Sequence, residues 1–458
     1  MDEQSHSLAA GFDPSLLALY PEQYSLLTDL YQLTMTACYV GEGVGDRRAS
    51  FELFVRRLPN QFGYLVAMGL EQALAYLERL CFTAEQVAAL QATNIFAGAT
   101  DEFWQLLTHA RFTGDVWAVP EGTVVFANEP LLRIEAPLWQ AQIVETCLLN
   151  IVNYQTLLAT RAARIRDVAG SQATLLEFGT RRAFGPQAAI WAARATLAAG
   201  FNATSNVLAA LQLGHKPAGT MAHALVMALS ALEGSEMQAF TAFHRYFPGA
   251  PLLIDTYDTI AAAQALATKM QAGELELAGV RLDSGDLADL SQKVRALLPE
   301  VAIFASGDLD EFRIAELKAQ GACIDGYGLG TQVVTGAPVN GVYKLVEIDG
   351  IPVMKEAPGK VTYPGRKQIV RQVENGQFVR DLLSLADDPV PHGEPLLQCV
   401  MREGQRLTPL EPLETIAHRT QQSVASLPAE VRQIQQPDAV LVEISDSLQT
   451  LTKQTHHA

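Results

Sequence analysis

The chain has 458 residues, of which 49% are hydrophobic and 18% charged, so it can form two or three packed domains and is not expected to be disordered. Its formal net charge of -17 argues against a nucleic-acid-binding protein, because such proteins present a basic face. Five scattered cysteines without a CxxC pair predict neither a zinc site nor a disulfide framework. The sequence shows no signal-peptide pattern and no membrane-spanning run, so we expect a cytoplasmic protein that does not associate with membranes.

The first part of the chain combines helices with short strands. Periodic apolar positions predict helices over most of 25–110, with an alternating, strand-like run at 49–56. Residues 113–136 alternate between apolar and polar residues and contain turn-forming Pro and Gly, which predicts a small β region. A helix is expected from about 140 to 168.

Seven apolar runs follow, and each one ends in a polar cluster. Helical patterns separate most of these runs, and this alternation predicts a parallel α/β barrel. In such barrels the loops after the strands converge at one end, where the chemistry takes place. Strands are expected at 173–178, 199–203, 218–221, 251–255, 278–283, 301–305 and 323–328, and helices at 186–199, 206–213, 259–271, 287–298 and 311–319.

The alternation stops after residue 346. Residues 347–410 are rich in β-branched residues, Gly and Pro, which predicts strands that return to the N-terminal β region, and 412–436 predicts one or two helices. The expected fold is therefore an α/β barrel plus a mixed α/β domain built from both ends of the chain. Its expected parts are an extension at 1–20, an N-terminal α/β domain at 21–150, the barrel with the active site at 151–346, and a returning C-terminal segment at 347–458.

The polar cluster after the fifth run combines a cation with a carboxylate. Arg281 and Asp283 are two residues apart, so on a strand they point to the same face. An arginine binds phosphate or carboxylate with two nitrogens, and an aspartate can hold a Mg²⁺ ion that bridges phosphates. The alternative is a buried structural ion pair with Asp286 as a helix cap.

Glycines follow the last two runs. Residues 326–331 (GYGLGT) resemble a phosphate nest, in which glycines let backbone N–H groups approach an anion and Thr331 adds a hydroxyl. The cluster 306–308 (SGD) precedes it by one strand, and late barrel strands often bind phosphate together. A glycine turn without any ligand remains the alternative.

One histidine follows the third run. In the segment 219–223 (GTMAH), His223 stands at a strand end or in the first turn of the next helix. A neutral imidazole there can act as a base, a ligand or a nucleophile toward phosphate. A single histidine is more often structural, and no second His or Cys is spaced for a metal.

Together these motifs make the chain similar to the nicotinate phosphoribosyltransferase family over roughly Tyr24 to Gln368. The similarity includes the segments 28–35 (TDLYQLTM), 177–183 (EFGTRRA), 219–223, 280–287 and 327–335, followed by 341–345 (GVYKL). Several long motifs in the right order make this resemblance specific. It implies the type II phosphoribosyltransferase fold, an irregular, TIM-like α/β barrel joined to a mixed α/β domain formed by N- and C-terminal segments.

The resemblance also implies a reaction, in which nicotinate and phosphoribosyl pyrophosphate form nicotinate mononucleotide and pyrophosphate for NAD salvage, while ATP is hydrolysed alongside. It implies Mg²⁺ and a homodimer with shared active sites. The resemblance further implies a role for each matching residue: His223 is phosphorylated by ATP, and Phe178 and the partner subunit's Tyr31 stack on the pyridine ring. Arg281 and Thr220 contact nicotinate or the ribosyl group, and Asp283 holds ribose or Mg²⁺. Arg181 lies near the phosphates, and the 5′-phosphate is held by Gly307, Asp308, Gly330 and Thr331.

The residue at position 205 distinguishes nicotinate-using enzymes from the similar nicotinamide-using enzymes. The similar nicotinamide-using enzymes carry Asp at the matching place, and an Asp beside the carboxylate of nicotinate would cost about 1–4 kcal/mol at 4 Å. The neutral Ser205 therefore predicts nicotinate as the substrate. Nicotinamide phosphoribosyltransferase activity remains the main alternative.

Other classes fit the residues less well. A non-catalytic metabolite-binding protein on the same scaffold would be expected to lose His223, Arg281 or Asp283, and a quinolinate-type enzyme would need more cations. A sugar-phosphate aldolase would need a lysine at a strand end to form a Schiff base, and none of the seven polar clusters contains one. Residues 252–259 resemble the sugar-diphosphate motif of type I phosphoribosyltransferases but lack its paired acids and glycine-rich loop, so we interpret them as a barrel strand with Asp258 capping the next helix.

Overall fold

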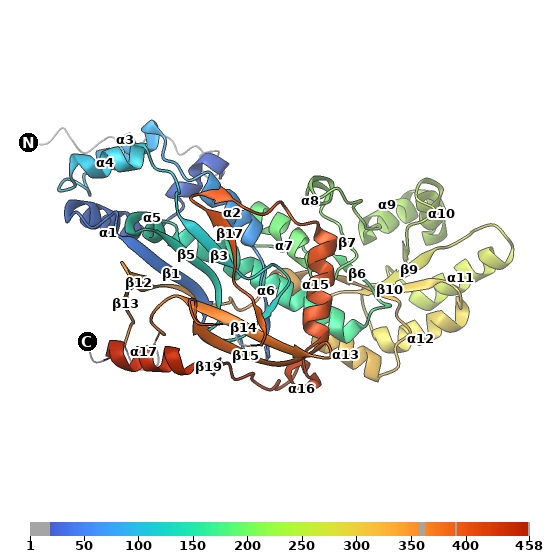
Figure 1. The fold of residues 1–458 in the computed structure, drawn as a ribbon. Coiled ribbons are helices and arrows are strands. Elements are labelled where there is room, and N and C mark those ends of the chain that lie inside the picture. Colours follow the sequence, from blue (N-terminus) through green and yellow to red (C-terminus); the bar gives the residue numbers. More distant parts are fainter. Residues whose placement is uncertain (1–18, 357–361, 390–391, 457–458) are drawn as a thin grey trace, which may run out of the picture.

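The computed structural model describes residues 19–356, 362–389 and 392–456. It confirms a mixed α/β fold in which a parallel sheet with helices packs beside a set of largely antiparallel sheets (Figure 1). Most of the predicted extension at 1–20 lies outside the described residues. Among the described helices, none is long and apolar enough to cross a membrane.

The helices, strands and small β region predicted for the first part of the chain are confirmed. The helix expected at about 140–168 is two helices that meet at Val144. In order, the elements are η2 (Pro21–Leu26), α1 (Leu30–Gly41), β1 (Arg48–Val55), β2 (Leu65–Val66), α2 (Leu70–Glu78), α3 (Ala84–Ala92), α4 (Asp101–Thr108), β3 (Asp115–Ala118), β4 (Val124–Val125), β5 (Pro130–Pro137), α5 (Leu138–Ile143) and α6 (Glu145–Ala169).

Strands from the two ends of the chain share one sheet, in the order β13-β12-β1-β5-β3-β17-β18. The N-terminal β1 pairs antiparallel with the late strand β12 on one side and with β5 on the other, and β17 pairs with β3. A second sheet has the order β16-β14-β15-β19, and β2 pairs with β4. The remaining elements of this half are β12 (Gly341–Ile348), β13 (Ile351–Pro352), β14 (Lys367–Glu374), β15 (Gln377–Leu385), β16 (Glu394–Pro395), β17 (Gln398–Arg402), β18 (Gln405–Arg406), β19 (Glu443–Ile444), α15 (Leu413–Ala425), α16 (Ala429–Arg432) and α17 (Asp446–His456).

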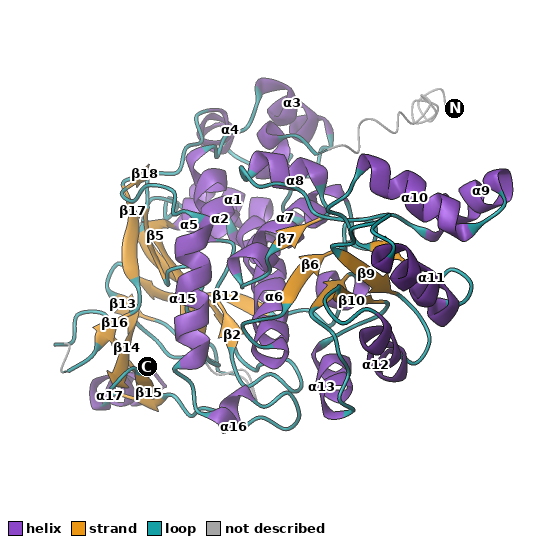
Figure 2. Cartoon of the chain, turned by 90° about the vertical axis from the view of Figure 1, so that its right-hand side faces the viewer, coloured by secondary structure: helices purple, strands orange, loops and turns teal. Residues whose placement is uncertain are grey.

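The parallel sheet has the strand order β7-β6-β11-β10-β9-β8, and helices flank it in Figure 2. Six of the seven predicted strands are present, although most are shorter than expected. The strands are β6 (Thr174–Glu177), β7 (Ala203–Thr204), β8 (Leu252–Leu253), β9 (Gly279–Leu282), β10 (Ala302–Ser306) and β11 (Gly326–Leu329), and the helices are α7 (Pro186–Ala198), α8 (Val207–Gln212), α9 (His223–Glu233), α10 (Glu236–Tyr246), α11 (Thr259–Gln271), α12 (Leu287–Leu297), α13 (Glu311–Ala319) and α14 (Thr331–Val334).

The seventh strand, predicted at 218–221, was wrong. This segment forms only isolated contacts with both edges of the sheet: the Ala218 N–H donates to the Thr204 carbonyl at 2.9 Å, and the Thr220 hydroxyl donates to the Pro251 carbonyl. Pro217 has no N–H to donate and Gly219 weakens extended pairing, so a regular ladder does not form. The segment therefore bridges β7 and β8 without being a strand.

The long helix α6 joins the two halves. Its residues belong to two separate hydrophobic cores, with Leu158 and Ala162 packed on the side of the parallel sheet and Leu157 and Ile151 on the side of the antiparallel sheet. A helix that is apolar on two faces has to be covered on both. Figure 1 shows α6 between the two sets of strands, as this composition requires.

Candidate active site

A small cavity lies at the parallel sheet and gathers three of the residues predicted for the site. Phe178 follows β6, Arg281 belongs to β9, and Thr220 lies in the bridging segment between β7 and β8. The cavity is lined by Leu176, Phe178, Gly219, Thr220, Pro251, Arg281, Phe304 and Gly328. An aromatic ring, a cation and apolar walls together suit a flat, negatively charged ring.

Glycines in β11 make room for the aromatic side chains of this cavity. A Cβ atom added at Gly328 would lie 2.5 Å from the Phe178 ring, and one added at Gly326 would lie 2.6 Å from the Phe304 ring. These two glycines lie inside a buried strand, so the prediction that all of 326–331 forms a phosphate nest was wrong for its first part. Only Gly330 and Thr331 lie beyond the strand, at the start of α14.

His223 begins α9 and reaches toward the strand ends. Its Nδ1 lies 3.0 Å from the hydroxyl of Thr256, and its Nε2 lies 3.9 Å from Oδ2 of Asp283. Both side chains are more than a third exposed, so the pair is open to solvent and to ligands. The structure therefore places the predicted histidine and the predicted aspartate side by side.

Asp283 is held in place by neighbouring strand ends. Its Oδ1 accepts a hydrogen bond from the Ser306 hydroxyl at 2.5 Å, and its backbone N–H donates to Asp255 at 2.7 Å. Gly307 packs on the Asp283 carbonyl, because an added Cβ would lie 2.3 Å from that oxygen. Gly307 also has a φ of 96°, a conformation that favours glycine.

Asp255 was missed as a site residue. The same oxygen of Asp255 that accepts from the Asp283 N–H also accepts from the Ser284 hydroxyl at 2.7 Å. Its place at the end of a predicted strand was the signal in the sequence, but the segment around it also resembles the type I motif, which gives Asp255 no role in a barrel. The other part of that interpretation is confirmed, since Asp258 caps α11 by accepting from two backbone N–H groups.

Arg281 is largely buried and keeps unused hydrogen-bonding capacity. Burial lowers the pKa of Arg281, while Asp283 and Asp255 act in the opposite direction. Its Nε has no hydrogen-bond partner within the described residues, and no ion pair of 4.0 Å or less joins it to Asp283. The alternative of a closed structural ion pair is therefore wrong, although Asp286 does cap α12 as that alternative supposed.

Glu177 is a second residue whose part in the site the sequence did not predict. This buried carboxylate accepts from the Thr204 hydroxyl at 2.5 Å and from the N–H of Gly179, so it ties the loop after β6 to β7. Burial raises the pKa of Glu177. Ser205 lies next to Thr204, and its N–H donates to the Glu177 carbonyl at 2.9 Å, but Ser205 does not line the cavity.

The remaining predicted residues lie at varying distances from this centre. Arg181 is exposed in the loop after β6 and is close enough to Arg281 to affect its pKa. Asp308 is exposed after β10 and has a φ of 48°. Tyr31 lies on α1, 47% exposed, near Glu145 rather than near Phe178. Both views separate α1 from β9, so a single chain does not bring Tyr31 to the cavity (Figures 1 and 2).

The side chains at the strand ends suit a Mg²⁺ ion that is also bound by the substrate better than a metal ion whose ligands all come from the protein. Within the described residues, no three His, Cys, Asp or Glu side chains are grouped to hold a metal ion. Oδ2 of Asp283 accepts no hydrogen bond from the described residues and is open to solvent. A single open carboxylate fits Mg²⁺, which usually binds one or two carboxylates together with substrate phosphates.

Comparisons with known proteins identify the family of the chain. Models described as the nicotinate phosphoribosyltransferase N-terminal domain, the nicotinate phosphoribosyltransferase family and the nicotinate phosphoribosyltransferase C-terminal domain match residues 26–153, 173–304 and 392–452, respectively. The chain is 42% identical to nicotinate phosphoribosyltransferase pncB2 of Mycobacterium tuberculosis, over 90% of this chain and 89% of the relative. It is 43% identical to nicotinate phosphoribosyltransferase of Bacillus subtilis, over 81% of this chain and 78% of the relative.

A solved structure is also similar. The crystal structure of human nicotinic acid phosphoribosyltransferase superposes with a TM-score of 0.83 at 30% identity, covering 93% of this chain and 99% of the human chain. The similarity thus extends over both the parallel sheet and the antiparallel half. The chain belongs to the nicotinate phosphoribosyltransferase family.

Proposed function

We propose that this enzyme transfers the phosphoribosyl group of phosphoribosyl pyrophosphate to nicotinate, forming nicotinate mononucleotide and pyrophosphate for NAD biosynthesis, with ATP hydrolysed to ADP and phosphate. The observation that carries the proposal is the convergence of Phe178, Thr220 and Arg281 on one cavity, with the His223 and Asp283 pair at the neighbouring strand ends. The names of the relatives support the same activity.

The cavity residues orient the ring. Phe178 offers an aromatic face, and Gly328 keeps that face in position because it has no side chain. The Arg281 guanidinium has an unused Nε donor for a carboxylate or a phosphate oxygen. A ring held in this way presents its nitrogen in a fixed direction, which lowers the entropic part of the barrier for a weak nucleophile.

Charge develops as pyrophosphate leaves the ribosyl carbon. Arg281 and the exposed Arg181 can take up negative charge on the departing group, and Asp283 can hold the ribose hydroxyls or the metal. When bound, Mg²⁺ neutralises charge on the pyrophosphate. Gly307, Asp308, Gly330 and Thr331 follow β10 and β11, and we assign the 5′-phosphate to their backbone N–H groups and the Thr331 hydroxyl.

His223 is the residue that we assign to ATP coupling. His223 Nδ1 lies 3.0 Å from the Thr256 hydroxyl, and in the tautomer that has its proton on Nδ1 this N–H donates to the hydroxyl. The lone pair of Nε2 then faces Asp283, and we assign it as the nucleophile toward the γ-phosphate of ATP. The new Nε2–P bond forms as the bond from phosphorus to the ADP oxygen breaks, and water later releases phosphate from the histidine. A charged phosphohistidine beside Asp283 changes the local field where pyrophosphate binds, which links ATP hydrolysis to substrate affinity and to the equilibrium.

The active form is proposed to be a homodimer. Tyr31 is half exposed on α1 and lies away from its own cavity, so it can act as the second ring-stacking residue only in a neighbouring subunit. Exposed apolar side chains on the helices around the parallel sheet offer a surface for such contact: Val207, Leu208, Leu211, Met227 and Leu232.

One assay tests the reaction and the phosphohistidine together. Purified protein is given phosphoribosyl pyrophosphate and Mg²⁺ with nicotinate or nicotinamide, with and without ATP, as wild type and as His223→Ala. We expect turnover of nicotinate alone, stimulated by ATP in the wild type but not in the variant. Turnover of nicotinamide would contradict the assignment of Ser205, and no turnover of either base would contradict the proposed activity.

A further inference from the structure

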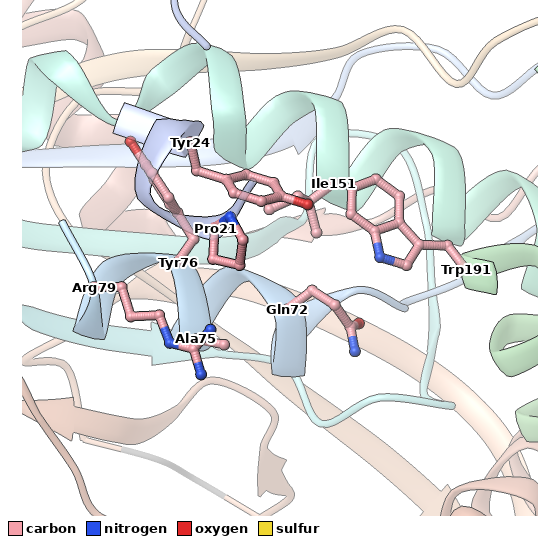
Figure 3. A pocket seen from close by; sticks show the side chains of 8 residues that line it. All are labelled: Pro21, Tyr24, Gln72, Ala75, Tyr76, Arg79, Ile151 and Trp191. Carbon is pink, nitrogen blue, oxygen red and sulfur yellow. The ribbon is translucent and has the colours of Figure 1, made fainter. Parts of the chain in front are cut away.

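A second cavity lies where η2, α2, α6 and α7 meet. It has a volume of about 160 Å³ and shares no lining residue with the cavity at the strand ends. Tyr24 of η2, Tyr76 of α2 and Trp191 of α7 supply aromatic walls, and Ile151 of α6 adds an apolar surface (Figure 3). None of these residues has a part in the proposed reaction.

The volume of this cavity corresponds to one aromatic ring. An engineered apolar cavity of about 150 Å³ is known to bind benzene, so a space of this size admits a single six-membered ring but not a fused or nucleoside-sized group. Tyr and Trp walls favour a flat guest, because their faces and edges make stacked and edge-on contacts with a ring. Tyr24 is held in position by a hydrogen bond of 3.4 Å from its hydroxyl to Gln187 at the start of α7.

Two polar groups, Gln72 of α2 and Arg79 directly after this helix, lie at opposite ends of the cavity. Oε1 of Gln72 is buried and has no hydrogen-bond partner among the described residues. The exposed Arg79 likewise forms no ion pair with any described acidic residue. In Figure 3 the Gln72 amide lies toward Trp191, whereas the Arg79 guanidinium lies toward the other end, beyond Ala75.

The spacing of these groups defines the ligand. Gln72 lies in the first turn of α2 and Arg79 is the residue that caps its C-terminal end, seven residues later, so helical geometry puts both on one face about 10 Å apart along the helix axis. A ring that carries an acid at one end and a hydrogen-bond donor at the other spans this distance with both groups paired. The position of Arg79 after α2 is also favourable for a cation without any ligand, because helix C-termini attract positive charge, and the experiment has to separate these two explanations.

We propose that this cavity is a second small-molecule site, which binds a monocyclic aromatic acid with a para hydrogen-bond donor. The ring lies between Tyr24, Tyr76 and Trp191, the carboxylate pairs with Arg79, and the donor satisfies Oε1 of Gln72. The site shares no lining residue with the cavity of the proposed reaction, and none of its residues belongs to the strand ends.

The test uses Trp191 as a local reporter in the full-length protein. The chain has four tryptophans, so labelling with 5-fluorotryptophan gives four ¹⁹F resonances, and Trp191→Phe assigns the one in the cavity. The probe is 4-hydroxybenzoate, and 4-hydroxybenzamide is its neutral counterpart. The variants are Arg79→Gln, which removes the cation, Ala75→Phe, which fills the cavity, and Arg111→Gln, an exposed arginine outside the cavity that serves as the control.

We expect 4-hydroxybenzoate to shift the Trp191 resonance in a saturable way and to leave the other three in place. Binding should weaken about tenfold or more for the amide and in Arg79→Gln, remain unchanged in Arg111→Gln, and vanish in Ala75→Phe. An unmoved Trp191 resonance at millimolar probe would overturn the proposal. Equal affinities for acid and amide, or for wild type and Arg79→Gln, would overturn it as well. Arg79→Gln changes an exposed side chain and should not disturb folding. Its affinity for the probe therefore tests the proposal even if Ala75→Phe fails to fold.

Discussion

His223 and Asp283 face each other at the strand ends, with Nε2 of the imidazole 3.9 Å from Oδ2 of the carboxylate. The separation is too long for a hydrogen bond, and both side chains are more than a third exposed, so a ligand can reach the space between them. Ser306 holds the other carboxylate oxygen, so Asp283 cannot turn away from the histidine without losing that bond. A phosphate, a metal ion or ribose hydroxyls that bind here therefore meet both side chains.

The first prediction concerns the charge of Asp283. Asp283→Asn keeps the shape and the hydrogen bond from Ser306 but removes the charge, so we expect kcat/KM for phosphoribosyl pyrophosphate to fall about 100-fold, as for loss of one strong electrostatic contact. Steady-state kinetics over a range of Mg²⁺ concentrations measures the effect. Asp289→Asn, on the exposed face of α12, is the control and should be neutral. Equal kinetics for both variants would show that Asp283 has no part in the reaction.

The second prediction concerns the space that Gly328 leaves for Phe178. Gly328→Ala places a methyl group 2.5 Å from the ring, so the ring has to move. We expect the free energy of unfolding to fall by about 1–3 kcal/mol and KM for nicotinate to rise. Denaturant unfolding and steady-state kinetics check the two effects. Gly98→Ala is the matched control, because nothing lies within 4 Å of its added Cβ. An unchanged KM in Gly328→Ala would contradict ring stacking by Phe178.

The third prediction concerns substrate choice. Ser205→Asp introduces a negative charge next to Thr204, at the edge of the site, and like charges about 4 Å apart cost about 1–4 kcal/mol. We expect kcat/KM for nicotinate to fall at least tenfold relative to that for nicotinamide. Ser205→Asn has nearly the same size without the charge and should have a much smaller effect. If Ser205→Asp left the kinetics with nicotinate untouched, the electrostatic explanation of specificity would fail.

The fourth prediction tests the shared active site. Arg281→Ala disables the cavity of its own chain, and Tyr31→Ala disables the cavity of its partner. Each pure variant should be nearly inactive, whereas a mixture after subunit exchange should regain about a quarter of the wild-type activity, because half of the dimers contain one intact site. Activity measured against mixing ratio checks this. No recovery, despite dimer exchange shown by differential labelling, would rule out sharing of Tyr31.

The fifth prediction concerns pH and Glu129, which is buried between β4 and β5. Burial, followed by the nearby Asp381, raises the pKa of Glu129 well above its ordinary value, with Arg371 acting in the opposite direction. The folded chain therefore keeps a proton that the unfolded chain releases. The resulting stabilisation is complete below the unfolded pKa of about 4.3 and is lost as the pH rises toward the folded pKa.

Glu129→Gln mimics the protonated acid at every pH. We expect the free energy of unfolding of this variant to equal that of the wild type near pH 4 and to exceed it increasingly toward pH 8. Urea unfolding at a series of pH values measures the difference, with the exposed Glu233→Gln as the control. A constant difference across the series would mean that Glu129 does not titrate differently in the folded state.

Much of the fold was predictable because local rules determine it. Buried parallel strands read as apolar runs, and aspartates such as Asp258, Asp286 and Asp310 mark helix starts by accepting from backbone N–H groups. The segment 218–221 was the exception, since its composition resembles a strand but its Pro217 and Gly219 neighbours prevent a ladder. The α9 and α10 pair after it was only partly anticipated, as a helix that follows His223.

The sequence by itself determined which chemical groups end each βα unit, because covalent order and apolar periodicity place them there. The tertiary structure decided which of these groups meet. Only the packing shows that Asp255 accepts a hydrogen bond from the backbone of Asp283. It also shows that Gly326 and Gly328 make space for aromatic rings rather than for phosphate. Tyr31, finally, lies away from the cavity of its own chain. Such contacts join residues far apart along the chain, so they depend on the register of strands and the volume between them, which no local pattern encodes.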